Sequence, residues 1–220
     1  MAFRGFPIEG LEFYEQLAAD NSRSIWQANK GRYDEFVKQP MVELTEALAD
    51  YGPFHMFRPY NDVRFSKNRP PYKVQQGAYG ESEGGAGFYV QFSADGLMVG
   101  AGYYAMAKDQ LERFRAAIDR DALGTELAEL VADAEKRKYS IGAIDELKTA
   151  PRGYPKDHPR IELLRRKGLI AVQEFGTPKW IHSAAAARRV RQSWEGVADL
   201  CSWLDTHVGP STLPPDDRPF

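Results

Sequence analysis

Positively charged side chains alternate with aromatic residues and prolines between residues 56 and 79, where five bases stand against one acid. A guanidinium is a planar fork that donates paired hydrogen bonds to a phosphate or a carboxylate, and a lysine adds a compact positive charge. Because the charges do not follow a helical stripe, we interpret this segment as a candidate anion-binding site. Its bases are Arg58, Arg64, Lys67, Arg69 and Lys73, and its acid is Asp62.

The spacing within this segment allows several side chains to act together. In an extended chain alternate residues point to the same side, which places Asp62, Arg64 and Ser66 on one face. Asp62 would then orient Arg64 toward an anion. A plain Asp–Arg pair that ties a strand to a neighbouring element is the structural alternative. The candidate ligand-binding residues of the segment are Arg58, Arg64, Ser66, Lys67, Tyr72 and Lys73.

A second basic region spans residues 136–191, with fourteen bases and five acids. Within it a loop over residues 151–159 is punctuated by proline and glycine, and Arg152 and Lys156 are its candidate ligand-binding residues. Two clusters of like charge repel unless an anion or interleaved carboxylates offset them. We expect this loop and the 62–67 strand to lie side by side as one basic cleft. Ordinary solvated surface is the alternative.

Few residues in these segments suit acid–base chemistry. His158 is the candidate general acid–base, because an unperturbed imidazole titrates near neutral pH. Asp62 is the second residue with a candidate catalytic role, as the orienting carboxylate. Asp157 or His158 would also cap a helix that begins near Pro159, and free N–H groups at a helix start attract anions. A plain cap and a partly buried, hydrogen-bonded histidine need no ligand, so the sequence leaves open whether the protein is an enzyme.

Other kinds of active site are not predicted. Cys201 is the only cysteine among 220 residues, which excludes a disulfide framework and a cysteine-based zinc or iron–sulfur site. The four histidines are far apart in sequence and lack ligand spacing, so no metal site is predicted. The glycine-rich run 84–87 is not followed by Lys-Ser or Lys-Thr, as a phosphate-binding P-loop would be. No cofactor is assigned.

The predicted elements run in the order helices, strands, helices. Apolar residues at helical spacing mark helices before residue 52 and again after residue 107. The sequence therefore predicts an α+β fold, with a central antiparallel sheet packed by N-terminal and C-terminal helices. Its hairpin near 87–104 has Asp95-Gly96 as the turn. The expected strands are 60–65, 72–78, 87–93 and 97–104, and residues 169–175 could form one more.

Some features of this fold can be stated more closely. The spacing of Trp26 and Tyr33 on one helical face predicts that both are core residues. Pro40 is expected to break the second helix. One long final helix is expected to carry the apolar residues between 190 and 204. We expect residues 1–208 to form a single domain, and residues 209–220 to form a flexible, proline-rich tail.

The overall composition is that of a globular protein. The chain has 29 Lys and Arg against 31 Asp and Glu, a formal net charge of −2, and 43% hydrophobic residues. The longest apolar-leaning stretch, 96–107, is too short to span a bilayer, and the N-terminus does not look like a signal peptide. We therefore expect a soluble, cytoplasmic protein with no membrane partner.

Both basic segments resemble the domain of unknown function 2461 family, which is widespread in bacteria and also found in fungi. That family typically shows Arg-x-x-Arg-Asp-x-Arg-Phe-Ser-Lys-Asp-Lys-x-Pro-Tyr-Lys. Here the matching residues are Arg58, Asp62, Arg64, Phe65, Ser66, Lys67, Pro71, Tyr72 and Lys73, whereas Asn61, Asn68 and Arg69 differ. A later family stretch is matched by Leu147, Lys148, Pro151, Gly153, Tyr154, Asp157, His158 and Pro159. The resemblance covers nearly the whole chain and implies no established activity.

The sequence leaves three candidate functions open. The first is an anion-recognising enzyme or small-molecule-binding protein, whose partner is a small anionic ligand with a phosphate or carboxylate group. The second is a nucleic-acid binder, which the interleaved cations and aromatic residues favour and the overall acidity disfavours. The third is a structural or partner-binding domain, in which both segments only lock helices to the sheet.

Overall fold

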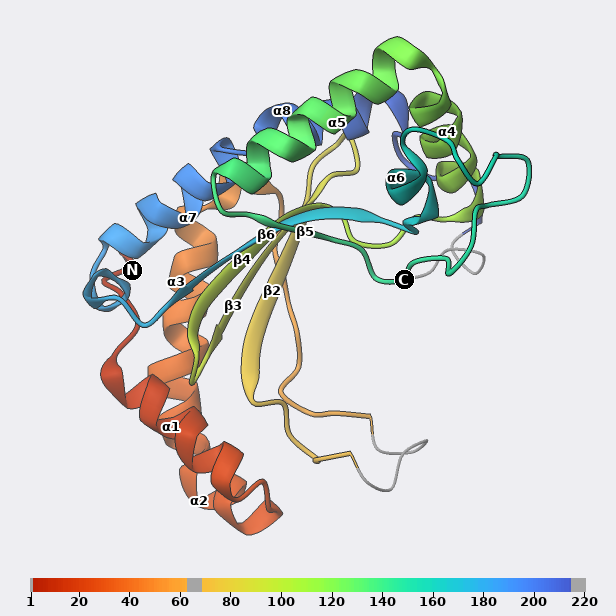
Figure 1. Ribbon diagram of the computed structural model, residues 1–220. Coiled ribbons are helices and arrows are strands. Elements are labelled where there is room, and N and C mark those ends of the chain that lie inside the picture. The colour runs from red at the N-terminus through yellow and green to blue at the C-terminus, as the bar shows by residue number, and fades with distance from the viewer. Residues whose placement is uncertain (1, 63–68, 215–220) are drawn as a thin grey trace. The chain divides into compact units, whose positions relative to one another are not determined.

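The computed structural model describes residues 2–62 and 69–214 (Figure 1). Its helices are α1 (Ile8–Ala19), α2 (Arg23–Tyr33), the π-helix η1 (Asp34–Lys38), α3 (Gln39–Ala47), the 3₁₀ helix η2 (Ala49–Tyr51), α4 (Lys108–Asp119), α5 (Asp121–Lys136), α6 (Ile161–Arg165), the 3₁₀ helix η3 (Lys179–His182), α7 (Ala185–Glu195) and α8 (Ala198–His207). Its strands are β1 (His55–Met56), β2 (Gln75–Glu81), β3 (Gly87–Ser93), β4 (Gly96–Tyr103), β5 (Ser140–Gly142) and β6 (Leu169–Gly176).

Over the described residues the strands form one six-stranded antiparallel sheet in the order β1-β2-β3-β4-β6-β5. At one edge His55 of β1 lies opposite Tyr79 of β2, and at the other Ile141 of β5 lies opposite Ala171 of β6. In the sequence α1–α3 precede this sheet, α4–α6 lie between β4 and β6, and α7 and α8 follow it. The predicted α+β fold is therefore confirmed.

The chain divides into two compact units, which we describe separately. The first unit comprises Met1–Gly80, Tyr89–Val99 and Glu174–Ser193. The second unit comprises Glu81–Phe88, Gly100–Gln173 and Trp194–Phe220.

Aromatic rings form the core of the first unit. Phe6 and Phe92 stack with their ring centroids 4.2 Å apart, and Phe13 contacts Trp26 edge-on at 6.0 Å. Trp26 and Tyr33 are 3% and 4% exposed, so the prediction that both are core residues is confirmed. Burying aromatic side chains of this size removes large apolar areas from water and dominates the stability of a core.

The second helix does not end at Pro40, contrary to the sequence-based expectation. The chain stays helical from α2 through η1 into α3, where Pro40 occupies the first turn. In η1 the N–H of Gln39 donates to the carbonyl of Asp34, five residues earlier, which widens the helix locally. Pro40 has no N–H to give to the Phe36 carbonyl, and that carbonyl faces Gly10 of α1 instead. A Cβ on Gly10 would lie 2.6 Å from it.

The hairpin of β3 and β4 is confirmed, but its turn lies one residue earlier than predicted. The turn residues are Ala94 and Asp95, whereas Gly96 is the first residue of β4. Gly96 has a φ of +96°, a conformation that other residues rarely adopt. Gly96 is therefore the residue with positive φ that follows the turn. It is not one of the two turn residues.

The second unit holds the end of the chain against α4. The predicted single final helix is two helices, α7 and α8, because the chain leaves helical geometry between Glu195 and Ala198. After α8, the carboxylate of Asp109 accepts hydrogen bonds from Ser211 and Thr212. The guanidinium of Arg113 donates to the backbone oxygens of Val208 and Pro210. The first residues of the predicted tail are thus bonded to a helix.

Candidate functional site

The two arms of the first basic segment run antiparallel in the first unit. Tyr60 and Tyr72 form a β-bridge, and the N–H of Lys73 donates to the carbonyl of Pro59 at 2.8 Å. Asn21, just before α2, fixes this pair of arms from outside. Its side-chain amide donates to the carbonyl of Tyr72 and its amide oxygen accepts from the N–H of Tyr72, both at 3.0 Å.

The ring of Tyr72 is packed in the core and does not face solvent. Tyr72 is 7% exposed and stacks on Trp26, with the centroids 4.5 Å apart and the planes 11° from parallel. Tyr60 lies edge-on to Trp26 at 5.8 Å and is 45% exposed. Of the two tyrosines in the bridge, only Tyr60 offers an open ring to a ligand.

Cations gather beside this bridge. The amine of Lys73 lies 5.3 Å from the ring centroid of Phe57, which is 38% exposed. Burial lowers the pKa of the Lys73 amine, and the positive charges of Arg58 and Arg69 lower it further. Neither these two arginines nor Lys73 forms an ion pair with any residue that the structure describes. We call Arg58, Arg69 and Lys73 the cation cluster.

A buried glutamine keeps Phe57 in place under Lys73. The side-chain amide of Gln76, which is 1% exposed, donates to the carbonyl of Phe57 at 2.9 Å. Its amide oxygen accepts the hydroxyl proton of Tyr33 at 2.6 Å. The bond to Tyr33 is buried and the bond to Phe57 is partly buried, so Gln76 links the backbone next to the cation cluster to the α2 helix.

The other candidates of this segment lie at or beyond the limit of what is described. Asp62 is partly buried and has bonding partners. Arg64, Ser66 and Lys67 lie outside the described residues. Their assignment as ligand-binding residues, and that of Asp62 as the carboxylate that orients Arg64, stay predictions. Arg69, which the sequence analysis counted among the bases but did not select, joins the cation cluster.

In the second unit, both ring nitrogens of His158 are engaged. Its Nδ1 accepts a hydrogen bond from the backbone N–H of Arg160 at 3.0 Å, and its Nε2 lies 3.3 Å from a carboxylate oxygen of Asp119. The residue is 9% exposed, and its ring meets Tyr154 edge-on. These contacts are those of a buried histidine that joins the 151–159 loop to the end of α4.

The expected cap of the following helix is not formed. The helix α6 begins at Ile161, with Arg160 in the cap position and no side chain bonded to its first turn. Asp157 is exposed. The N–H of Ile161 donates to the backbone carbonyl of His158 and not to its side chain. Because α6 has five residues, its dipole is small, and we assign no anion site to its N-terminus.

The two loop cations of the prediction are solvent-exposed. Arg152 and Lys156 form no ion pair within the described ranges 2–62 and 69–214. They belong to the second unit, whereas the cation cluster belongs to the first. The expectation that the 62–67 strand and this loop form one cleft therefore stays a prediction.

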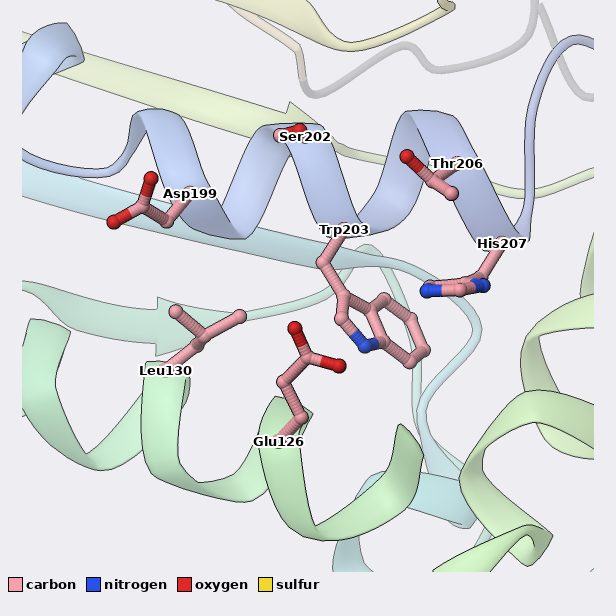
Figure 2. Close-up of a pocket in the computed structure, with 7 residues that line it drawn as sticks. All are labelled: Glu126, Leu130, Asp199, Ser202, Trp203, Thr206 and His207. Carbon is pink, nitrogen blue, oxygen red and sulfur yellow. The ribbon is translucent and has the colours of Figure 1, made fainter. Parts of the chain in front are cut away.

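A groove of about 430 Å³ lies between α5 and α8, within the second unit (Figure 2). Its charged side chains include the carboxylates of Glu126 and Asp199, and none of the predicted site residues lines it. The indole nitrogen of Trp203 is buried without a hydrogen-bond partner, and in Figure 2 it points toward α5. The carboxylates make this groove unfavourable for an anion.

The described residues hold neither a metal-binding cluster nor a membrane-spanning helix. None of these residues form a cluster of three or more histidine, cysteine, aspartate or glutamate side chains that could hold a metal ion. Among the same residues, no helix has the length and apolar character needed to cross a membrane.

Comparison with known sequences places the chain in a family. The model of a family described as conserved hypothetical protein (DUF2461) matches residues 9–203, and the chain belongs to this family. That match includes both basic segments and confirms the resemblance on which the sequence analysis relied. Searches of curated proteins and of solved structures found no match.

Proposed function

We propose that this protein binds a small anionic molecule, with a phosphate or carboxylate group, through the cation cluster. The observation that carries this proposal is the gathering of three cations on the two paired arms, where Lys73 bonds Pro59 beside Arg58, and none of the three forms an ion pair with a described residue. Neighbouring cations repel one another, which agrees with the lowered pKa of the Lys73 amine. A bound anion would remove this repulsion, and the two arginines can donate paired hydrogen bonds to it.

The proposal is one of binding and includes no catalytic step. His158 is the candidate acid–base, and both of its ring nitrogens already have partners. Acid–base catalysis needs a nitrogen within hydrogen-bond reach of the substrate. We also propose a cytoplasmic location, for which the single cysteine among 220 residues is the support.

Nucleic-acid binding is the second candidate, because exposed aromatic rings stand beside the cluster. Phe57 and Tyr60 are 38% and 45% exposed, and bases stack on such rings while cations contact the phosphates. Filter binding of single-stranded oligonucleotides at low and high salt tests it. Retention at low salt that falls steeply with salt supports this candidate, and no retention at low salt excludes it.

Removing charge from the cluster is expected to weaken anion binding. The variants Lys73→Gln and Arg58→Gln should each reduce the affinity for inorganic phosphate or citrate about tenfold, since a hydrogen bond to a charged group contributes about 1.5–3 kcal/mol. Titration calorimetry at constant ionic strength measures this. Lys38→Gln, which removes an exposed cation of η1 in the same unit, is the matched control. An equal loss of affinity in all three variants would show that the effect comes from the net charge of the protein and not from the cation cluster.

The pH dependence of phosphate binding gives a second measurement on the same cluster. The Lys73 amine is charged below its pKa, so affinity should fall as the pH rises through that lowered pKa. An arginine stays charged over the whole range from about pH 7.5 to about pH 10.5. The phosphate affinity of Lys73→Arg should therefore stay constant over this range. A parallel decline in the wild type and in this variant would contradict a role for Lys73.

A further inference from the structure

One arginine of α4 is partly buried without a counter-charge. The Nε of Arg115 donates to the backbone carbonyl of Leu164 on α6 at 3.1 Å, which joins α4 to α6. Its two terminal nitrogens have no hydrogen-bond or ion-pair partner among the described side chains and backbone. Burial lowers the pKa of Arg115. A cation in such a position is stabilised by any anion that reaches it.

The carboxylate best placed to pair with Arg115 is used elsewhere. Asp119 follows Arg115 by four residues on the same helix, a spacing that commonly gives an ion pair. Here Asp119 faces Nε2 of His158 at 3.3 Å instead. The loop that carries His158 is fixed by Arg160, whose guanidinium donates to the carbonyl of Ile118 at 2.9 Å. The loop therefore draws the negative charge away from Arg115.

The same loop places Tyr154 beside the contact of His158 with Asp119, which lies one helical turn from Arg115. Tyr154 is partly buried, its ring meets His158 edge-on at 6.4 Å, and it interacts electrostatically with Arg115. Burial raises the pKa of the Tyr154 hydroxyl, and the charge of Asp119 raises it further, while Arg115 opposes both. The hydroxyl is therefore protonated at neutral pH and can donate a hydrogen bond.

We propose that Arg115 and Tyr154 form an anion-binding pair in the second unit, and that the ligand is a phosphate group, free or esterified. The two terminal nitrogens of the guanidinium come from α4 and the phenol hydroxyl comes from the loop, and all of them are hydrogen-bond donors. A phosphate has enough acceptor oxygens to receive all of them, and its dianion suits the exposed cations Arg152 and Lys156 of the same loop. His158 then acts as a positioning residue, because it keeps Asp119 off Arg115.

The test compares phosphate affinities of variants at neutral pH and constant ionic strength. Arg115→Gln should weaken the binding of inorganic phosphate about tenfold or more, and Tyr154→Phe about threefold or more. Arg120→Gln removes an exposed cation close by in the same unit and should leave the affinity unchanged. Asp119→Asn should raise the affinity, because it removes the competing negative charge, and a merely structural role for Asp119 predicts no such gain.

Phenyl phosphate is titrated in parallel, to separate a preference for an ester from a preference for the free ion. Melting curves in chloride alone check that each variant is folded, and Arg115→Lys, which keeps the charge but loses the fork, should bind with intermediate affinity. Unchanged phosphate binding in both Arg115→Gln and Tyr154→Phe would overturn the inference. Loss of phosphate binding only in the Lys73 and Arg58 variants would also overturn it, yet would leave the proposed function in place.

Discussion

Replacing Asp205 by alanine is expected to lower the free energy of unfolding by about 2–4 kcal/mol, because three hydrogen bonds to a carboxylate are lost together. Asp205 of α8 accepts from the N–H of Ala86 at 2.9 Å and from the hydroxyl of Ser82 at 3.2 Å, and it shares the hydroxyl proton of Tyr103, 3.1 Å away, with the carbonyl of Gly84 at 2.7 Å. These contacts hold the glycine-containing loop between β2 and β3. Ala86 is fully buried, so without Asp205 its N–H keeps only its bond of 3.1 Å to the Ser82 hydroxyl and has little access to water.

Chemical denaturation of two single variants and of their combination tests this role. Tyr103→Phe removes one donor and should cost about 1 kcal/mol, and the effects of Tyr103→Phe and Asp205→Ala should not add, because the two residues share a hydrogen bond. Asp205→Asn keeps the shape without the charge and should cost less than Asp205→Ala. A free energy of unfolding for Asp205→Ala within about 0.5 kcal/mol of wild type would show that the loop is held by other contacts.

The sequence predicts those elements of the fold whose signals are local. Helical spacing places Trp26 and Tyr33 on one buried face, and alternating apolar residues predict β3 and β4. The π-helix has no local signal of this kind. Its extra residue per turn accommodates Pro40, and the carbonyl of Phe36 then faces Gly10 of α1, a contact between two helices that the local sequence does not indicate. A proline alone predicts a break, which is why this boundary was wrong.

The candidate site shows the same limit. Charge counting along the chain finds Arg58 and Lys73, because the segment is locally rich in cations. It does not reveal that Tyr72 stacks on Trp26, since that contact depends on how α2 packs. Nor does it single out Arg115, an arginine in an ordinary amphipathic helix. Its lack of a counter-charge follows from the pairing of Asp119 with His158, which only the folded chain brings together.

The local signal for a hairpin between β3 and β4 is correct, but it places the turn one residue too late. Asp95-Gly96 predicts a hairpin, but the glycine serves a long-range contact as well as the turn. An added Cβ at Gly96 would lie 1.8 Å from the carbonyl oxygen of Gly176 and 2.2 Å from its carbon. Backbone atoms of β6 therefore occupy the space that a side chain would need, and no rotamer change can relieve the overlap.

Gly96→Ala is accordingly expected to lower the free energy of unfolding by about 3–5 kcal/mol, from the sum of backbone strain at positive φ and displacement of β6. Gly176→Ala is the matched control at the other side of the same contact. Gly176 has a φ of +67°, yet its added Cβ would meet nothing within 4 Å. It should therefore cost only the strain, about 1–2 kcal/mol.

Equilibrium denaturation of both variants separates strain from overlap, because the first is common to both glycines and the second belongs to Gly96 alone. If Gly96→Ala does not accumulate as a folded protein, Gly96→Asn provides the comparison, since asparagine tolerates positive φ better than alanine but brings the same Cβ. A folded Asn variant as stable as Gly176→Ala would contradict the close approach of β4 and β6 at this position. A cost well above that of Gly176→Ala would show that the glycine is required by contact with β6 and not by the turn alone.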